Sequence, residues 1–352
     1  MTHPNSPSPQ FTLQQLGWKP VFQQQVELDQ WQDTPARVFA VHRNRLDIVT
    51  EQGELSLPLT PGMPRITVGD WLLLGEQAQD VTLLERRSLF QRKAAGTALE
   101  AQLIAANVDT LFIVSSLNDD FNLNRMERYL ALAHEAEVEP VIVLTKADLC
   151  GEPDTYVGQV QRLDPLLVVI AVNALDSSAA EQLAPWCRSG NTVALMGSSG
   201  VGKSTLVNTL LGGEVQSTGT IREDDSKGRH TTTGRSLHLM QHGGLLLDTP
   251  GMRELQLTDC EQGVNDVFAD ITELAKQCRF GDCQHEGEPG CAVARAIEDG
   301  TLSERRLASY QKLLREQAHN SASLAEKRSR DRDLSKMYRS VQNHHRANKG
   351  KR

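Results

Sequence analysis

The stretch from residue 193 to residue 205 decides the fold: Val193-Ala194-Leu195-Met196 is followed by Gly197-Ser198-Ser199-Gly200-Val201-Gly202-Lys203-Ser204-Thr205. An apolar run, a glycine-rich turn and a helix-compatible segment form the strand, loop and helix of a phosphate-binding loop. Backbone N–H groups converge on a phosphate in such a loop, and side chains at the three glycines would obstruct that approach. Lys203 then offers a charge to the β and γ phosphates, and Ser204 a hydroxyl ligand to Mg²⁺. The stretch predicts a nucleotide site at residues 197–205, with Lys203 catalytic.

A second motif precedes this loop in the chain. Apolar residues 140–144 predict a buried strand that ends in Thr145-Lys146-Ala147-Asp148. GTPases read guanine with such a tetrapeptide, usually with Asn in the first place, so Thr145 is a departure. The Asp148 carboxylate accepts from both guanine N1–H and N2–H₂, which adenine cannot offer, so we expect GTP rather than ATP. The next predicted strand, residues 166–172, leads to Asn173 and Ala174, which we expect to form the second base-contacting loop.

Two further motifs follow the phosphate loop. A GTPase brings a threonine hydroxyl to Mg²⁺ from a mobile loop, and here the polar segment 213–236 offers Thr231, Thr232 and Thr233. We prefer Thr232, with Thr231 next. Apolar residues 245–247 then lead into Asp248-Thr249-Pro250-Gly251, where we expect Asp248 to hold Mg²⁺ through water and the Gly251 N–H to sense the γ phosphate.

The residue that orients the attacking water is not the usual one. Many GTPases use a glutamine directly after Asp-x-x-Gly, but this chain has Met252 there. We therefore predict slow hydrolysis by the isolated protein. The candidate that replaces the glutamine is His230, beside the switch threonines; the alternative is an ordinary exposed loop histidine.

The order of the motifs is informative. In ordinary GTPases the guanine motif comes last, whereas here residues 145–148 precede the phosphate loop, so we expect a circularly permuted domain. Permutation preserves the geometry of a site because new termini open at a surface loop. The alternation of strands and helices predicts a parallel sheet with its ligands at the carboxyl ends of the strands.

The flanking regions predict a multidomain chain. Five short apolar or alternating runs in residues 35–85 predict a β-barrel of the oligonucleotide-binding (OB) type, although a barrel used only for packing has the same pattern. The basic residues after it are Arg86, Arg87, Arg92 and Lys93. We expect them either to contact RNA phosphates or to form a solvated face. We expect a mobile arm at 1–34, the OB-fold barrel at 35–93, the permuted α/β P-loop GTPase at 94–260, a small α-rich zinc-binding domain at 261–320 and a basic tail at 321–352.

The charge distribution and the cysteine spacing bear on the compartment and on metal binding. The chain of 352 residues has net charge −8, but residues 321–352 contain ten Lys or Arg against three Asp or Glu. Without a signal-like N-terminus or a long apolar run, we expect a cytoplasmic protein that does not enter membranes, where clustered cysteines favour metal over disulfides. The set Cys278, Cys283, His285 and Cys291 predicts one structural Zn²⁺ per chain.

These motifs together resemble the RsgA (YjeQ) family of GTPases that depend on the small ribosomal subunit. The similarity covers about residues 35–315 and includes residues 102–108, the permuted motif order, 228–233, 248–251 and the cysteine segment 278–293. It implies a ribosome-stimulated GTPase that binds the 30S subunit and 16S rRNA late in subunit maturation, with GTP or GDP, Mg²⁺ and zinc; we expect a monomer.

Two other functions fit parts of the sequence. One is an RNA-binding assembly factor with a regulatory nucleotide site that does not hydrolyse, and intact Lys203, Ser204 and Asp248 argue against it. The other is a P-loop ATPase or kinase, which Asp148 and the absence of a substrate-lid motif disfavour.

Overall fold

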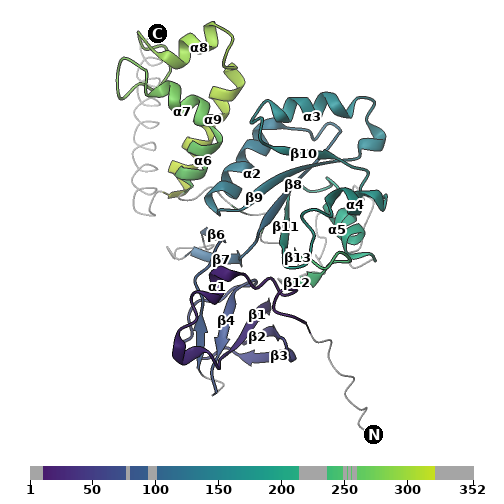
Figure 1. The fold of residues 1–352 in the computed structure, drawn as a ribbon. Helices are drawn as coiled ribbons and strands as arrows, with labels where there is room; N and C mark the ends of the chain where they lie inside the picture. The colour runs from purple at the N-terminus through teal and green to yellow at the C-terminus, as the bar shows by residue number, and fades with distance from the viewer. Residues whose placement is uncertain are drawn as a thin grey trace, which may run out of the picture.

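The computed structural model describes residues 11–76, 80–93, 101–213, 236–248, 252, 255 and 260–321. Figure 1 shows a small barrel built from the N-terminal strands, a larger sheet flanked by helices, and a helical module at the other end of the molecule. Among the described residues, no helix is both long enough and apolar enough to cross a membrane.

The five strands predicted for the N-terminal part are all present. They are antiparallel and lie in the order β3-β2-β1-β4-β5, and their inward side chains, among them Val38, Ile48 and Leu72, are fully buried. Burial along β1, β2 and β4 is largely continuous rather than alternating, because side chains of successive residues are covered in two separate clusters. The strands are β1 (Thr34–Val41), β2 (Arg45–Thr50), β3 (Gly53–Pro58), β4 (Trp71–Leu74) and β5 (Val81–Leu83).

The segment before the barrel is folded from residue 11 onward. It contains the short helix α1 (Pro20–Gln23) and the 3₁₀ turn η1 (Leu28–Gln30). Leu16 and Phe22 are buried, and the Trp18 ring lies edge-on to Trp71 with centroids 4.8 Å apart. The predicted mobile arm over 1–34 is therefore wrong for residues 11–34, because their apolar side chains cover one end of the barrel. Residues 1–10 lie outside the described part.

The predicted boundary between barrel and GTPase domain also needs correction. Strand β6 (Leu89–Lys93) pairs antiparallel with β7 (Ala101–Ala106), and Phe90 and Ile104 are buried together in the large core. A boundary at residues 93 and 94 cuts this hairpin. The two strands form one unit because they are paired in one antiparallel ladder and share buried side chains in one core.

Arg37 joins the barrel to the larger sheet. Its side chain is 1% exposed and donates hydrogen bonds to the carbonyls of Leu16, Gly69 and Asn107 and to the Thr192 hydroxyl, at 2.7–3.1 Å. Burial lowers the pKa of Arg37 to about 10, although nearby carboxylates oppose the shift, so it stays charged at neutral pH. A buried charge with this many acceptors fixes the junction.

The central sheet has the predicted parallel organisation. Strands β10, β9, β8, β11 and β13 are parallel neighbours, and antiparallel β12 follows β13 and touches β1 through Ala40 and Ser236. The predicted strand at 166–172 is shorter, because Leu166 lies in an exposed turn. The strands are β8 (Thr110–Ser116), β9 (Glu139–Thr145), β10 (Val168–Ala171), β11 (Thr192–Met196), β12 (Ser236–Leu239) and β13 (Leu245–Asp248).

Helices cover both faces of this sheet. Helices α2 and α3 share one apolar core with one face, and α4 and α5 share a second core with the other face. This two-layer covering buries the near-continuous apolar strands expected of a parallel sheet. The helices are α2 (Leu123–Glu135), α3 (Pro153–Gln161), α4 (Ser178–Leu183) and α5 (Lys203–Leu211), and the 3₁₀ turn η2 (Ala147–Leu149) follows β9.

The helical module packs on α2. An added Cβ at Gly263 would lie 2.1 Å from the Ala131 carbonyl oxygen, so only glycine allows this close approach of α6 to α2. The Gly263 N–H donates to the Glu135 carboxylate at 2.9 Å. The module contains α6 (Glu261–Val267), α7 (Ala269–Ala275), α8 (Ala292–Glu298) and α9 (Glu304–Ser321).

A buried ion network completes this contact. Glu127 of α2 is fully buried and accepts from Arg305, Arg306 and Ser309 of α9 at 2.6–3.0 Å. Arg306 also donates to the Asp270 carboxylate at 2.8 and 3.0 Å. Every oxygen of the buried carboxylate has a charged donor, which is the condition under which a buried charge is tolerated.

Candidate nucleotide and metal sites

The phosphate loop follows β11, as predicted, and enters α5. Gly197 lies against β8, where an added Cβ would be 2.2 Å from the Val114 carbonyl oxygen. Gly200 and Gly202 have positive φ values of 78° and 92°, and Gly202 is the N-cap of α5. These conformations suit glycine, and a glycine-rich turn at a helix N-terminus is the kind of element that binds phosphate.

Lys203 lies at the base of this loop. Its side chain is 8% exposed, and its ammonium donates to the carbonyl of Gly197 at 2.7 Å and also to that of Ser198. The lysine charge is therefore held inside the loop, next to the N-terminus of α5. Ser204 and Thr205 are half-buried in the first turn of that helix.

The guanine motif is tied to the phosphate loop by its unusual first residue. Thr145 is fully buried, and its hydroxyl donates to the Val201 carbonyl at 2.6 Å. Lys146 has a left-handed φ of 60°, and its ammonium donates to the Gly200 carbonyl at 3.1 Å. Thr145 thus supplies a polar support between the two loops, so its replacement of the commoner Asn does not leave the loop unsupported.

The remaining predicted base-binding residues lie on adjoining strands of the same sheet. Asp148 is exposed in η2, and the Ala147 N–H donates to the Val172 carbonyl at 3.2 Å, which joins this turn to the end of β10. Asn173 and Ala174 follow directly, and the Ala174 carbonyl accepts from Thr209 of α5 at 2.7 Å. Both loops are at the carboxyl ends of parallel strands, where α/β proteins bind ligands.

The predicted magnesium ligands fall partly within the structure. Asp248 ends β13, the strand paired with β11, and it is half-buried, while Ser204 is the second residue of α5. A carboxylate and a hydroxyl beside a phosphate loop are oxygen donors of the kind that Mg²⁺ prefers. His230, Thr231, Thr232, Thr233 and Gly251 lie outside the described residues.

Met252 is placed clearly. Its side chain is 2% exposed and belongs to the large core that contains α2 and the helical module. A buried thioether has neither a useful donor nor a strong acceptor. The position directly after the Asp-x-x-Gly motif therefore contributes packing, not orientation of water.

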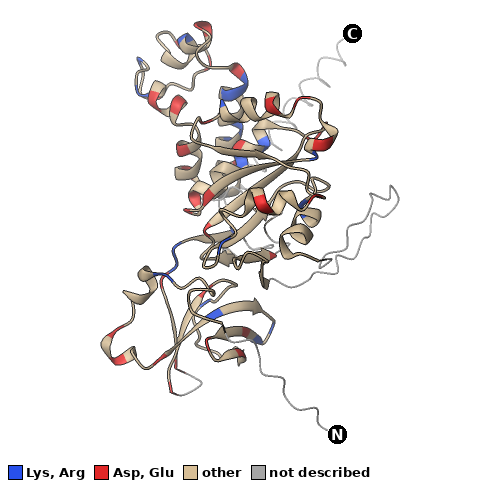
Figure 2. Cartoon of the chain, turned by 45° about the vertical axis from the view of Figure 1, so that its right-hand side comes forward, with Lys and Arg blue, Asp and Glu red and all other residues tan. Residues whose placement is uncertain are grey.

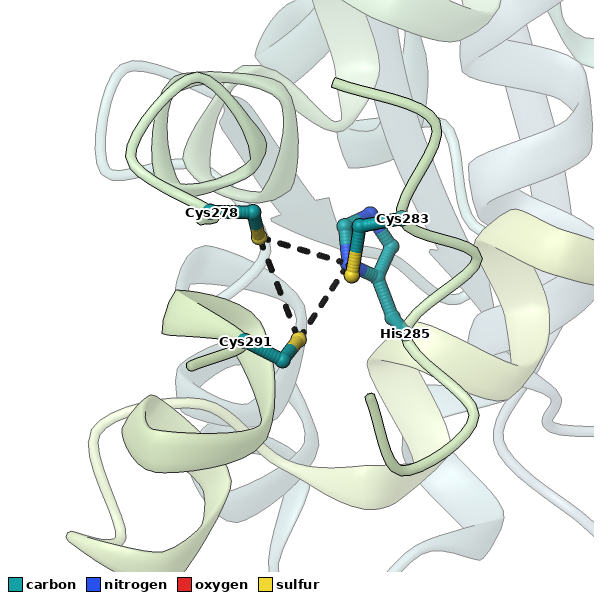
Figure 3. A group of neighbouring side chains, drawn as sticks. All are labelled: Cys278, Cys283, His285 and Cys291. Carbon is teal, nitrogen blue, oxygen red and sulfur yellow. Dashed lines mark hydrogen bonds between the residues drawn. The ribbon is translucent and has the colours of Figure 1, made fainter. Parts of the chain in front are cut away.

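The four predicted metal ligands converge in the helical module. Figure 3 shows Cys278, Cys283, His285 and Cys291 pointing toward one another, and their ligand atoms lie within 4.8 Å of each other. His285 reaches the cluster through a left-handed φ of 62°, and its Nδ1 faces the sulfurs. The cluster has the donors and the closeness needed to hold a metal ion.

The distances between these ligand atoms can be compared with those around a tetrahedral zinc ion. The Sγ of Cys278 is 3.9 Å from that of Cys291, and the His285 Nδ1 is 3.4–3.7 Å from the three sulfurs. Tetrahedral zinc, with bonds of about 2.3 Å to sulfur and about 2.0 Å to nitrogen, separates its ligands by about 3.3–3.8 Å. The N–H groups of Ala292 and Ala294 donate to the Cys278 and Cys291 sulfurs at 3.4 and 3.3 Å, which stabilises thiolates.

Cysteines outside the cluster differ in chemistry. Burial raises the pKa of Cys187 to about 12 and, with a contribution from Glu135, raises that of Cys260 to about 12 as well. Both thiols are buried, and neither belongs to the group of four ligand atoms in the helical module.

Three basic residues that follow the barrel strands have partners within the chain. Arg86 pairs with buried Asp70 at 2.7 Å, Arg87 with Asp109 at 2.9 Å, and the Arg92 guanidinium donates to Gln102 at 3.0 Å. These partners were not foreseen from the sequence, and the Arg87 side chain remains 43% exposed. In the view of Figure 2, basic residues are interspersed with acidic ones over the barrel.

Comparison with known families gives a consistent result. The model of the RsgA GTPase family matches residues 83–258. A model of the ABC transporter family matches residues 181–336, a range that includes the phosphate loop common to P-loop NTPases.

Relatives match over nearly the whole chain. A protein of Vibrio parahaemolyticus named small ribosomal subunit biogenesis GTPase RsgA 2 is 62% identical over 330 residues, covering 94% of this chain and 92% of that protein. The small ribosomal subunit biogenesis GTPase RsgA of Mesorhizobium japonicum is 50% identical over 315 residues, covering 88% and 91%.

Solved structures agree on the fold. The crystal structure of YjeQ from Thermotoga maritima has a TM-score of 0.58 and 25% identity, and it covers 80% of this chain and 99% of that one. The structure of YloQ, described as a circularly permuted GTPase, has a TM-score of 0.59 and 21% identity, covering 84% and 99%. The second likeness concerns the fold alone, and it agrees with the permuted order of motifs found here.

Proposed function

Because this chain belongs to the RsgA GTPase family, we propose that it binds GTP, hydrolyses it to GDP and acts in biogenesis of the small ribosomal subunit. The observation that carries the proposal is the contact between the guanine motif and the phosphate loop: Thr145 and Lys146 donate to Val201 and Gly200. Base recognition and phosphate binding are thereby built into one site.

The chain's own residues suggest the division of labour. Lys203 and the N–H groups of residues 197–205 hold the phosphates, Asp148 accepts the guanine N–H groups, and Asn173 with Ala174 closes the base pocket. Mg²⁺ bound with GTP supplies charge neutralisation at the β and γ phosphates, and Ser204, Asp248 and Thr232 are its proposed ligands. Gly251 senses the γ phosphate.

Base specificity is tested at Asp148. Asp148→Asn replaces one of the two acceptor oxygens by an N–H₂ donor, so guanine loses the hydrogen bond from its N2–H₂ group, while the 2-oxo group of xanthine gains a donor. We expect the ratio of GTP to xanthosine triphosphate affinity to fall by about a thousandfold, since a site built for hydrogen bonds rejects a mismatched partner strongly. Nucleotide competition binding measures this ratio.

Asp154→Asn, on the exposed first turn of α3, is the matched control and should leave the ratio unchanged. An Asp148→Asn protein that still prefers GTP as wild type does would refute the assignment. ATP competing as well as GTP for the wild-type protein would favour the ATPase reading.

Ribosome-stimulated turnover is the second test. Since Met252 is buried and cannot orient water, the isolated protein should hydrolyse GTP slowly. We propose His230 as the group that a bound small subunit positions. Purified subunits should raise turnover by more than about tenfold, and His230→Ala should remove most of that rise while GTP affinity stays nearly constant.

The outcomes separate the two parts of this claim. No stimulation by subunits would contradict the proposed ribosomal role. If stimulation survives His230→Ala, the attacking water must be oriented by a ribosomal group or by another residue of the chain. His242→Ala, a change on an exposed turn, serves as the histidine control.

The accessory parts fit this role. The strand order β3-β2-β1-β4-β5 supports an OB-fold for the barrel, a fold that binds oligonucleotides. We propose 16S rRNA as its partner, with contacts also from the basic residues of 322–352. Arg86 and Arg87 are not proposed as contacts, because both are paired internally. Zinc in the cluster at 278–291 is proposed as structural, since four protein ligands leave no open position.

A further inference from the structure

Arg125 connects helix α2 to the phosphate loop. Its Nη1 donates to the Ser198 hydroxyl at 2.6 Å and to the Asp120 carboxylate at 2.7 Å. Its backbone N–H donates to the Asn122 side chain, the N-cap of α2, at 3.0 Å. Asn122 therefore fixes the backbone of Arg125, and Asp120 fixes its guanidinium. The start of α2 thus sets the position of the guanidinium that contacts the loop.

Ser198 is held from two sides. Its side chain accepts from Arg125, and its backbone carbonyl accepts from the Lys203 ammonium. The residue before it, Gly197, is pressed against the Val114 carbonyl and has no side chain to anchor it. Arg125 therefore adds a hold from another element to the first half of the loop, whose backbone carbonyls at Gly197 and Ser198 already accept from Lys203.

We propose that Arg125 is a positioning residue for GTP hydrolysis, acting through the Ser198 hydroxyl to hold the phosphate loop in its working conformation. The inference rests on the proposed GTPase function. A loop that is already in place needs no reorganisation when charge develops on the transferred phosphoryl group, so its effect is on the chemical step. In the described structure Arg125 does not contact the predicted guanine loop at 145–148, so we expect GDP affinity to be largely preserved without the Arg125 contact.

The same contact adds little to global stability. The side chains of Arg125 and Asp120 are 37% and 34% exposed, and ion pairs with that much solvent contribute little to folding. Removal of the guanidinium should therefore change the mobility of the loop and the value of kcat, while the midpoint of global unfolding stays the same. This separates positioning from a merely structural role.

The kinetic test compares Arg125→Met, Ser198→Ala and the double variant in the full chain. Each single change should lower kcat by about tenfold, the scale of one hydrogen bond to a charged group, with GDP Kd within about twofold of wild type. The double variant should be no slower than the slower single variant, because both remove one interaction. Arg125→Lys should recover part of kcat.

Arg162→Met is the matched control, since among the described residues the partner of that exposed arginine is the Gly158 carbonyl of α3. It should leave kcat unchanged. Multiplicative losses in the double variant would overturn the proposal, as would a loss confined to GDP Kd.

A second readout does not depend on activity. In nucleotide-free protein, amide hydrogen exchange of peptides covering 193–204 should become faster in Arg125→Met and in Ser198→Ala, to the same extent in the double variant, and not in Arg162→Met. Unchanged exchange would overturn the proposal even if turnover fell. A wild-type protein without turnover would remove the proposed function, while exchange would still decide the role of Arg125. Should Arg125→Met not fold, Ser198→Ala and Arg125→Lys give the same two readouts.

Discussion

Replacing Cys283 by alanine is expected to release the metal and to unfold residues 278–291 locally. The segment contains loops held by a few backbone bonds, and its four ligand atoms come within 4.8 Å only because the chain folds back on itself. Zinc binding to small thiolate sites amounts to about 10–16 kcal/mol and is inseparable from folding, so loss of one ligand removes the main source of order. Elemental analysis should find about one zinc per wild-type chain and none in the variant.

The matched control is Cys187→Ala, which removes a buried thiol outside the cluster and should keep the zinc. Amide exchange should quicken in 278–291 in the ligand variant and stay slow in the β-barrel. Wild-type protein that contains no zinc when purified without chelators would refute the zinc assignment. Zinc retained in Cys283→Ala would show that Cys283 is not a ligand.

Replacing Glu127 by alanine is expected to detach helix α9 from α2. The fully buried carboxylate accepts four hydrogen bonds from Arg305, Arg306 and Ser309, and its loss leaves Arg306 with Asp270 as its remaining carboxylate. Removing one partner of a buried pair costs about 3–5 kcal/mol because the other charge stays behind without compensation. Denaturant unfolding, followed by a probe in the helical module, measures the loss.

A second ion pair between the same helices provides the control. Arg128 and Glu316 are 2.7 Å apart, with side chains 28% and 30% exposed. Glu316→Ala should cost about 1 kcal/mol or less, since water screens this pair. Equal losses in the two variants would show that burial of Glu127 does not strengthen its role. A shift in both the module and the barrel would mean that the chain unfolds as one unit.

The features predicted well from sequence are those with a local signal. The apolar run 193–196 with its glycine-rich turn, the strand before Thr145 and the set Cys278, Cys283, His285 and Cys291 each follow from spacing within one short segment. Periodicity gave the five barrel strands for the same reason. The closeness of the guanine motif to the phosphate loop follows from the rule that ligands bind at the carboxyl ends of parallel strands.

What sequence reasoning missed depends on pairs far apart in the chain. Glu127 and Arg306 look like ordinary surface charges on two helices, and only packing shows that both are buried. Arg37 similarly has the pattern of a solvated strand residue. The fold of 11–34 had a weak signal in Leu16, Trp18 and Phe22, which polar neighbours outweighed. Arg125 lacked any signal, because its partner Ser198 lies on another element.

The strand order of the central sheet has a consequence for synthesis of the protein. Within the parallel part of the central sheet, β8, β9 and β10 are synthesised first. Strand β11, which pairs with the other edge of β8, emerges only after α2, α3 and α4. Until then the nascent chain carries a three-stranded sheet whose β8 edge has unpaired N–H and C=O groups. Open edges of this kind invite pairing with other chains, and nascent domains are exposed to it while translation continues. Chains that stop before residue 192 retain that open edge permanently, so truncation at this point yields a product prone to aggregate.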